Sequence, residues 1–477
     1  MRAIVLALLS LSAVPASAQA PAVQKGSAAP LTLAEVLRSS ARAAPQIIEQ
    51  LARIRQAEGR ALSATGAFDT VFDVDARSRV TGYYDGSVID SRVTRPFTNN
   101  GGYAYGNYRQ SRGDFPVYED QNYTNRAGEL KIGALYALLR DRLIDERRTR
   151  RSLAFADIDV ARFEAGAVAI GVQRRAIDAY QNWVAAGLRL QAYRNFLELA
   201  ESRRGAIVRQ IELGARPQIL LTENDQNLVR RRSLVVRAEG DFAAAANALS
   251  LLYRGEDGQP IIVGAERLPT DASALAGTPI SVNLSESVAR RPDLQTVLAR
   301  IDQSVVRLAQ AENELKPRLD LRGELGKDVG REGVGGPSRT PLEAVVGFRF
   351  SVPLQNRAAR GRVAEARAEI EGLNARDRLL RDQIVAEIEG ININVGASER
   401  LVEIAEQERV LADRLAEAER RRFALGSSDF FLVNQREDTA NDARVRLIDA
   451  QARIAAARSE LAAATADRTA LGLDQVR

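Results

Sequence analysis

Two stretches of the chain carry an apolar residue at every seventh position, and each begins shortly after a Leu-Gly dipeptide. Apolar side chains at this interval predict a helix that packs along one face against a partner helix. A Gly after a long polar helical pattern commonly ends the helix, and the chain can then reverse into an antiparallel helix. The apolar positions are Leu221, Leu228, Val235, Phe242 and Leu249 in the first stretch, and Val433, Ala440, Leu447, Ile454 and Leu461 in the second.

The two series keep the same spacing from their Leu-Gly dipeptides, and identical residues recur between them, as at Arg232 and Arg444. This recurrence predicts an internal duplication. The first repeat is expected to cover 19–253 with its turn near 214, and the second 285–477 with its turn near 426. The segment 254–284 has several Gly and Pro residues and no periodicity, which is typical of a connector. Two unrelated helical hairpins are the alternative interpretation.

Four other segments alternate apolar and charged residues at a period of two, which predicts strands with one apolar and one charged face. They lie near 68–83, 129–138, 318–327 and 342–354, and the last has the most regular alternation. We expect the charged face to line water. Its candidate residues are Asp73, Arg77, Glu129, Lys131, Arg322 and Glu324.

The segment 84–126, between the first two predicted strands, is rich in Gly, Asn and Tyr and is interpreted as a long polar loop. Tyr favours places where one end of the side chain is wet and the other apolar. An outer loop at a membrane rim fits this composition, and a glycan-binding patch is the alternative. The role of the loop stays open at this point.

Two Pro-free segments, about 140–213 and 357–425, are dense in Glu, Arg, Ala and Leu and predict two long helices. Each half then has the order short helix, strand, loop, strand, long helix, turn and medium helix. The expected fold is mainly α with a β-barrel portion, in which a long coiled-coil column carries four strands.

Four strands of about ten residues have the length needed to cross an outer membrane. In lipid an open sheet leaves backbone groups unpaired, so the sheet must close. Four strands cannot enclose a pore alone, whereas two copies would give eight strands and three copies twelve. A soluble sandwich with one wet face is the alternative.

The first residues resemble a secretory signal, with Arg2, an apolar run and then Ala16-Ser17-Ala18. We expect residues 1–18 to be removed and the rest to be exported. A transmembrane anchor is the alternative, but the apolar run is short for a membrane span.

The composition narrows the chemistry, because the chain has no Cys and no His. Ser-His-Asp and Cys-His catalysis and His-ligated metal sites are thereby excluded. The chain has 67 basic and 62 acidic residues, which are interspersed along helices as on a solvated face. We therefore expect no enzyme, no cofactor, no metal site and no nucleic-acid partner.

With its duplication, its Val352-Pro353-Leu354 exit from the fourth strand and its two Leu-Gly turns, the chain resembles the TolC family of outer-membrane efflux and secretion channels. The resemblance implies a homotrimer with a twelve-stranded barrel in the outer-membrane lipid and a helical barrel in the periplasm. It implies a passive exit duct of a tripartite efflux pump or a type I secretion system. The implied partners are a periplasmic adaptor protein and an inner-membrane RND or ABC pump.

In such proteins the Leu-Gly turns form the periplasmic tips that adaptors contact. By position, the tip residues here are Leu213, Gly214, Ala215, Leu425, Gly426, Ser427 and Ser428. Some members carry gate carboxylates at the positions of Leu432 and Gln435, and neither residue is acidic here. Asp429 remains an aperture candidate, because three inward copies would form a cation-selective constriction. A helix-start Asp favoured by the helix dipole is the alternative.

Two other functions stay open at the level of sequence. A periplasmic coiled-coil adaptor or scaffold without a membrane pore would explain the heptads, but it would not need four membrane-length strands. A glycan-degrading enzyme would need a pair of carboxylates in a cleft. The dispersal of acidic residues along helices argues against the enzyme.

Overall fold

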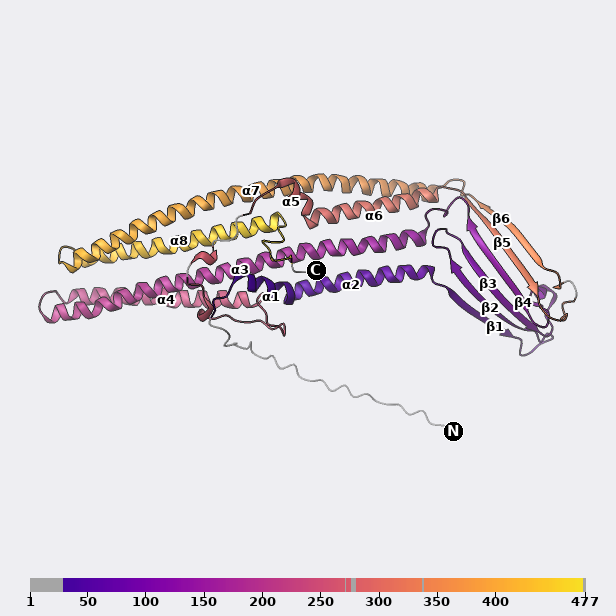
Figure 1. Ribbon diagram of the computed structural model, residues 1–477, viewed down its shortest axis with the longest axis horizontal. Coiled ribbons are helices and arrows are strands. Elements are labelled where there is room, and N and C mark those ends of the chain that lie inside the picture. Colours follow the sequence, from indigo (N-terminus) through magenta and orange to yellow (C-terminus); the bar gives the residue numbers. More distant parts are fainter. Residues whose placement is uncertain (1–28, 271, 276–279, 337–338, 475–477) are drawn as a thin grey trace, which may run out of the picture. The chain divides into compact units, whose positions relative to one another are not determined.

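The computed structural model describes residues 29–270, 272–275, 280–336 and 339–474, so the predicted signal sequence lies outside the described residues (Figure 1). The helices of the described chain are α1 (Leu33–Ala43), α2 (Pro45–Thr65), α3 (Glu146–Glu212), α4 (Ile219–Ser250), α5 (Leu284–Arg290), α6 (Pro292–Glu314), α7 (Arg357–Ala424) and α8 (Phe430–Ala464). The strands are β1 (Val71–Ser78), β2 (Ser87–Pro96), β3 (Tyr103–Arg112), β4 (Glu129–Ala137), β5 (Arg318–Asp328) and β6 (Glu343–Ser351).

The chain forms two compact units, each assembled from separate parts of the sequence. The first unit comprises residues 1–48, 169–282 and 388–477, and the second comprises 49–168 and 283–387. The two long helices, α3 and α7, each contribute one part to either unit. Within the described ranges, no helix combines the length and the apolar character that a membrane span requires.

In the first unit α3 turns sharply into α4, and α7 turns sharply into α8 (Figure 1). The predicted heptad positions are mostly buried, as at Leu228 and Leu249 in α4 and Val433 and Leu461 in α8. Small residues let antiparallel helices approach closely. They pack in this way between α7 and α8, where four Ala side chains form a buried cluster: Ala412, Ala416, Ala440 and Ala443.

The only Trp of the chain, Trp183, is fully buried in the first unit. Its ring centroid is 6.0 Å from that of Phe242 and 6.1 Å from that of Tyr180. The Tyr180 hydroxyl donates a hydrogen bond of 2.9 Å to the Leu31 carbonyl, and burial raises the pKa of Tyr180 to about 12. Trp183 therefore anchors α3 to α4, and Tyr180 fixes the segment before α1.

Each half of the chain begins with a capped short helix that a proline interrupts. Thr32 caps α1 through the Glu35 amide at 3.3 Å, and Asn283 caps α5 through the Glu286 amide at 3.4 Å. Pro45 and Pro292 then stand at the first position of α2 and α6, where their missing N–H costs nothing.

The second unit contains one antiparallel sheet whose strand order is β1-β2-β3-β4-β5-β6. The prediction of four strands per chain is therefore wrong, because the described residues form six. The four expected strands correspond to β1, β4, β5 and β6, with ends that differ by a few residues. The predicted polar loop 84–126 instead contains β2 and β3, so a count of twelve strands for three copies no longer follows. The fold class, mainly helical with a sheet portion, is confirmed.

The register keeps every pair of opposed residues on one face of the sheet. Beginning from Phe72 on β1, the opposed residues are Val93, Gly106, Ile132, Leu325 and Ala344. Beginning from Asp73, they are Arg92, Asn107, Lys131, Gly326 and Glu343. Because side chains alternate across a strand, the first row lies on an apolar face and the second on a charged face.

Candidate functional site

One face of the sheet is mainly apolar and exposed, with polar positions confined mostly to β2 and β3. Val346 and Phe348 at the centre of β6 are 72% and 70% exposed. The other large apolar side chains exposed on this face are Phe72, Val74, Ile89, Val93, Leu130, Ile132, Leu325 and Phe350. An apolar surface of this extent marks a contact with a membrane or with another protein.

On the opposite face, charged side chains of the central strands form a continuous ladder of ion pairs. Arg109 on β3 lies 2.8 Å from Asp90 on β2 and 3.9 Å from Glu129 on β4. Lys131 continues the ladder at 2.8 Å from Glu129 and 3.8 Å from Glu324 on β5.

Glu324 ends the ladder beside Arg322, at 2.7 Å, and accepts a hydrogen bond from the Tyr105 hydroxyl. Arg92 lies over the Tyr105 ring at 5.3 Å and donates to Asn107 at 3.2 Å. Because the charged side chains of the ladder form ion pairs and Tyr105 and Asn107 form hydrogen bonds, these side chains keep their positions when this face contacts water.

A hollow of about 880 Å³ lies on the charged face and is bounded almost entirely by polar groups. Its lining includes the ladder residues from Arg109 to Arg322, together with Gln121, Arg339 and Glu343. Among the described residues, no group of acidic side chains could hold a metal ion. The hollow thus offers a charged, water-accessible wall of alternating sign.

The sequence-based candidates for the water-lining face all lie on this charged face. Four of them, Glu129, Lys131, Arg322 and Glu324, belong to the ion-pair ladder. Asp73 and Arg77 lie on β1 at the edge of the sheet, where Arg77 contacts Asp75 at 2.8 Å. Sequence reasoning missed four members of the face that lie on β2 and β3: Asp90, Arg92, Tyr105 and Arg109. The signal that could have found them is the charge alternation Asp90-Ser91-Arg92, which the surrounding Gly and Tyr content obscured.

The two Leu-Gly turns of the first unit have the same backbone geometry. Gly214 and Gly426 have φ of +69° and +77°, in the left-handed region. The Gly214 amide donates to Ile211 at 2.9 Å and the Ala215 amide to Gln210 at 2.8 Å. This pair of bonds is the Schellman motif, which satisfies the last carbonyls of a helix.

The second turn repeats both bonds, from Gly426 to Phe423 at 3.0 Å and from Ser427 to Arg422 at 2.9 Å. The leucines that precede the glycines, Leu213 and Leu425, are 82% and 83% exposed. The Arg216 guanidinium of the first turn lies over the Phe423 ring, 5.1 Å from its centroid. The two turns thus contact each other and present exposed leucines.

Asp429 is the N-cap of α8, because its carboxylate accepts the Leu432 amide at 2.6 Å. This is the helix-start role, which was the alternative to a role in a cation-selective constriction. Leu432 is half-buried and Gln435 is exposed. Ser428 donates to the Glu419 carboxylate of α7, which ties the end of the turn to the preceding helix.

A buried ionic cluster joins α3, α4 and α8 near these turns. Arg231 of α4 and Glu437 of α8 are 2% and 3% exposed and lie 3.2 Å apart. Arg203 of α3 also contacts Glu437, and Arg231 lies 3.6 Å from Asp438. Burial lowers the pKa of Arg231 and raises that of Asp438, in both cases against the attraction of the paired charges.

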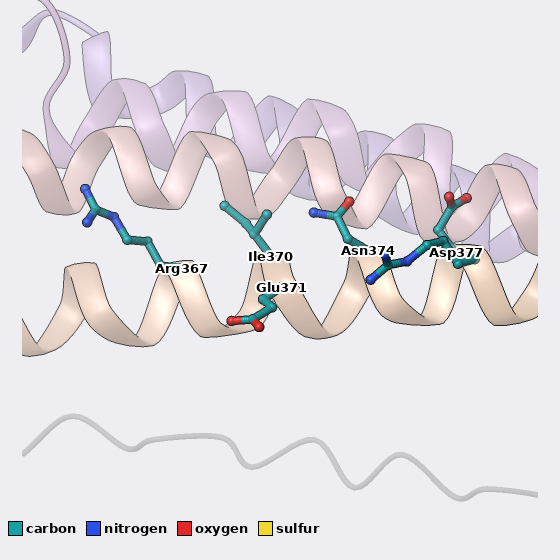
Figure 2. A pocket seen from close by; sticks show the side chains of 6 residues that line it. Arg367, Ile370, Glu371, Asn374 and Asp377 are labelled. Carbon is teal, nitrogen blue, oxygen red and sulfur yellow. The ribbon is translucent and has the colours of Figure 1, made fainter.

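A second hollow, of about 510 Å³, lies along the part of α7 in the second unit, and Figure 2 shows its lining side chains. Its charged lining residues are Arg367, Glu371, Asp377 and Arg378. Arg367 pairs with Glu312 at 3.0 Å, and Asp377 pairs with Arg381 at 3.0 Å. Two of the charged groups that line the hollow are thus already paired within α6 and α7.

The second unit therefore contains a sheet with a lipid-compatible face and a water-compatible face, and the first contains long helical hairpins with tight turns. Alternation of apolar and polar faces on strands of this length is the signature of outer-membrane barrels. The fold and the site together have the features of outer-membrane channels that carry a large helical part.

Comparison with known proteins shows what the chain is similar to. Residues 283–467 match the family model described as outer membrane efflux protein. No curated protein sequence matches the chain. The resemblance to the TolC family is confirmed, and this is a family of outer-membrane channels rather than of enzymes.

Three solved structures have the same fold over nearly their whole length. The open state of the MtrE outer membrane channel of Neisseria gonorrhoeae is 13% identical, with a TM-score of 0.64 over 96% of this chain and 97% of that one. The CmeC outer membrane channel of Campylobacter jejuni is 14% identical, with a TM-score of 0.61 over 98% and 95%. The outer membrane protein VceC of Vibrio cholerae is 14% identical, with a TM-score of 0.60 over 91% and 95%.

Proposed function

We propose that this chain is a passive outer-membrane efflux duct that assembles as a homotrimer. The observation that carries the proposal is the two-faced sheet: an exposed apolar face lies directly behind a face of paired charges. In lipid the sheet must close, and closure would bring the charged faces together around an aqueous lumen. Asp73, Arg77, Glu129, Lys131, Arg322 and Glu324 are the proposed lumen residues.

The apolar face is tested by placing one arginine at different depths of β6. Val346→Arg puts the charge at the middle of the strand, whereas Leu342→Arg puts it just outside the end of the strand. Arg at the centre of a bilayer costs about 2–4 kcal/mol in a barrel and about 0–1 kcal/mol near the interface. We expect Val346→Arg to abolish assembly in outer-membrane fractions and Leu342→Arg to assemble normally.

Equal behaviour of these two variants would contradict the membrane assignment. It would favour the alternative, a periplasmic coiled-coil adaptor or scaffold, since such a protein has no lipid-facing strand. The wild-type chain should also produce single-channel conductance in planar bilayers, and a protein that remains a monomer without conductance would reject the duct.

The finer assignment concerns the helical turns. We place the contact with a periplasmic adaptor at Leu213, Gly214 and Ala215 and at Leu425, Gly426, Ser427 and Ser428. The support is the equal geometry of the turns and the two exposed leucines, which make no core contact. An inner-membrane pump of the RND or ABC type would supply the energy, in a tripartite efflux pump or a type I secretion system.

Replacement of both exposed leucines tests the adaptor contact without disturbing the fold. Leu213→Ala combined with Leu425→Ala should change the free energy of unfolding by less than about 0.5 kcal/mol, because both side chains are exposed. We expect it to abolish efflux in cells while single-channel conductance of the purified protein is unchanged. Normal efflux with the double variant would contradict this placement of the contact.

For the aperture, the proposed residues are Asp429, Leu432 and Gln435. Asn is an N-cap as good as Asp, so Asp429→Asn removes the charge and keeps the cap. A loss of cation selectivity in this variant, with unchanged stability, would support a ring of Asp429 side chains. Unchanged selectivity would leave Asp429 with its capping role alone.

We also propose that the two halves, 19–253 and 285–477, are duplicated repeats joined by the connector 254–284. The support is the order of elements. In each half two helices separated at a proline lead into strands, then a long helix, a Schellman turn and a medium helix.

A further inference from the structure

Among the residues that the structure describes, each of the two edge strands of the sheet has a neighbouring strand on one side only. β1 pairs only with β2, and β6 pairs only with β5. Every residue of β1 is exposed, and so is every residue of β6 except the half-buried Gly347. An exposed edge of this length is a template for pairing with another strand, and it cannot remain open in lipid.

We propose that β6 of one copy pairs antiparallel with β1 of the next, with Arg349 opposite Asp73 of that next copy, and that three copies close an eighteen-stranded barrel. The inference rests on the homotrimer proposed above and adds the pairing register and the strand number. Because the strands alternate in direction and their number is even, β6 and β1 of neighbouring copies are antiparallel. A heterologous contact of this kind closes into a ring.

The stagger of the sheet determines the register. The row of opposed residues that starts at Val71, the first residue of β1, ends at Val345 on β6. At the end of the sheet where β1 begins, however, β6 extends six residues past this row, from Val345 to Ser351. Neighbouring strands begin and end together only if Val71 of one copy lies opposite Ser351 of the other. In that register the whole of β1 pairs, with Ser78 opposite Ala344.

The charges support the same register. Without an offset, Glu343 would lie opposite Asp73, which are like charges. With the offset, Arg349 lies opposite Asp73 on the charged face. On the apolar face Phe350 lies opposite Phe72, and aromatic cross-strand pairs stabilise sheets.

The pattern of ion pairs within one copy is consistent with this partner. The charged residues of the central ladder are paired, from Asp90 to Arg322. Asp73 and Arg349, by contrast, make no ion pair with any residue that the structure describes. Asp73 on one edge and Arg349 on the other are thus both available to pair with each other.

The geometry of a closed barrel agrees with the offset. An offset of about 6 residues per copy gives a total of about 18 across the eighteen strands. With about 3.3 Å per residue and about 4.8 Å between strands, the strands tilt by about 35°, within the range of membrane barrels. Barrels of 16–18 strands leave an aqueous channel, so the ion-pair ladders would line a wide lumen.

Cysteine cross-linking tests the register, and the chain has no Cys of its own. Asp73→Cys combined with Arg349→Cys should form disulfide-linked oligomers under oxidation in outer-membrane fractions. Asp73→Cys combined with Glu343→Cys, the register without offset, should form none, because a disulfide requires Cα atoms within about 7 Å. Cross-links in the second pair, or in neither pair, would overturn the proposed register.

The strand number is tested at β2. A fluorescent label on Val93→Cys, on the apolar face, should be quenched by brominated lipid, whereas a label on the adjacent Thr94→Cys should not. Equal quenching of the two labels, or protection of both, would show that β2 and β3 are not part of the wall and would overturn the eighteen strands.

Two measurements separate a failure of this inference from a failure of the proposed function. Trimers and conductance of the wild-type chain report on the function alone and are measured first. Each single variant, Asp73→Cys and Arg349→Cys, is then tested for trimers under reducing conditions. If the single variants assemble, the cross-linking result bears on the register and not on folding.

Discussion

The two halves of the chain build the sheet from unequal contributions. In the second half, β5 and β6 are joined by the short segment 329–342, whereas in the first half β1 and β4 are separated by 79–128. That longer segment inserts β2 and β3 into the wall, with each strand paired on both sides. A duplicated plan therefore does not require equal halves, because a two-stranded insertion preserves both the antiparallel order and the faces of the sheet.

The helical parts of the two halves differ in a similar way. Asp225 of α4 and Glu437 of α8 occupy equivalent positions after their turns. Asp225 forms an exposed pair with Arg204 at 2.7 Å, while Glu437 is buried between Arg203 and Arg231. Equivalent positions thus keep an acidic residue but place it in opposite surroundings.

The largest expected effect comes from making the halves equal. Deletion of 84–126 with a short linker should remove β2 and β3 and let β1 pair directly with β4, since Phe72 and Ile132 lie in one row on the same face. Because barrel diameter grows roughly linearly with strand number, the cross-section should fall to about 0.44 of the original. Electron cryomicroscopy of trimers measures it. An unchanged diameter would mean that the insertion does not widen the wall.

A smaller effect is expected where the buried and exposed acids are compared. Glu437→Ala leaves the Arg231 guanidinium buried without its partner, which should cost about 3–5 kcal/mol of unfolding free energy. Asp225→Ala removes an exposed pair and should leave the stability nearly unchanged. Chemical denaturation followed by helical circular dichroism measures both. Equal losses would contradict the asymmetry of the two halves.

A smaller loss of stability is expected from the N-cap of the helix that follows each turn, because only one of the two helices has a side-chain cap. Asp429 caps α8, whereas Gln218 at the start of α4 makes no capping bond with its side chain. Asp429→Ala should therefore destabilise the protein by about 1 kcal/mol, and Gln218→Ala should have no measurable effect. Thermal unfolding of the two variants decides between a capped and an uncapped turn.

The smallest expected effect is a pH-dependent change in folding stability, which compares an acidic residue in the first helix of each half. Burial opposes ionisation of Glu35, but hydrogen bonds from Arg267 and Tyr253 outweigh it and hold the pKa of Glu35 below 4.5. A lowered pKa means that the ionised pair stabilises the fold above about pH 4.5 and that this contribution is lost as the pH falls through the folded pKa.

We therefore expect Glu35→Gln to be less stable than the wild type at pH 7, with a difference that shrinks as the pH falls below about 4.5, as measured by thermal unfolding. The matched control is Glu286→Gln in α5, whose exposed pair with Arg290 should contribute little at pH 7. A difference between wild type and Glu35→Gln that persists unchanged at pH 3 would contradict the assigned pair.

Much of the fold could be predicted from local patterns. The Leu-Gly turns and the heptad helices were both predicted, because a helix stop and a heptad act over a few residues. The charged faces of β1, β4 and β5 were predicted for the same reason, since alternation is visible within one strand.

The strands β2 and β3 could not be predicted in this way. Their positions on the apolar face include Ser91, Arg95, Gly106 and Gln110, so neither segment has the aliphatic alternation of β6. Tyr103 and Tyr105 lie on the charged face, although aromatic residues in an alternating pattern are normally assigned to the apolar face. These segments are strands because both neighbours supply backbone hydrogen bonds, and strand propensity depends on such context.

The sequence by itself determined the helices, the turns and the two-faced character of the best strands, because these follow from side-chain periods within a short stretch of chain. Only the tertiary structure decided that the sheet has six strands, that the ladder runs from Asp90 to Arg322, and that Glu437 is buried while Asp225 is not. Pairing and burial depend on residues far apart in the chain, and no local pattern specifies which of them meet.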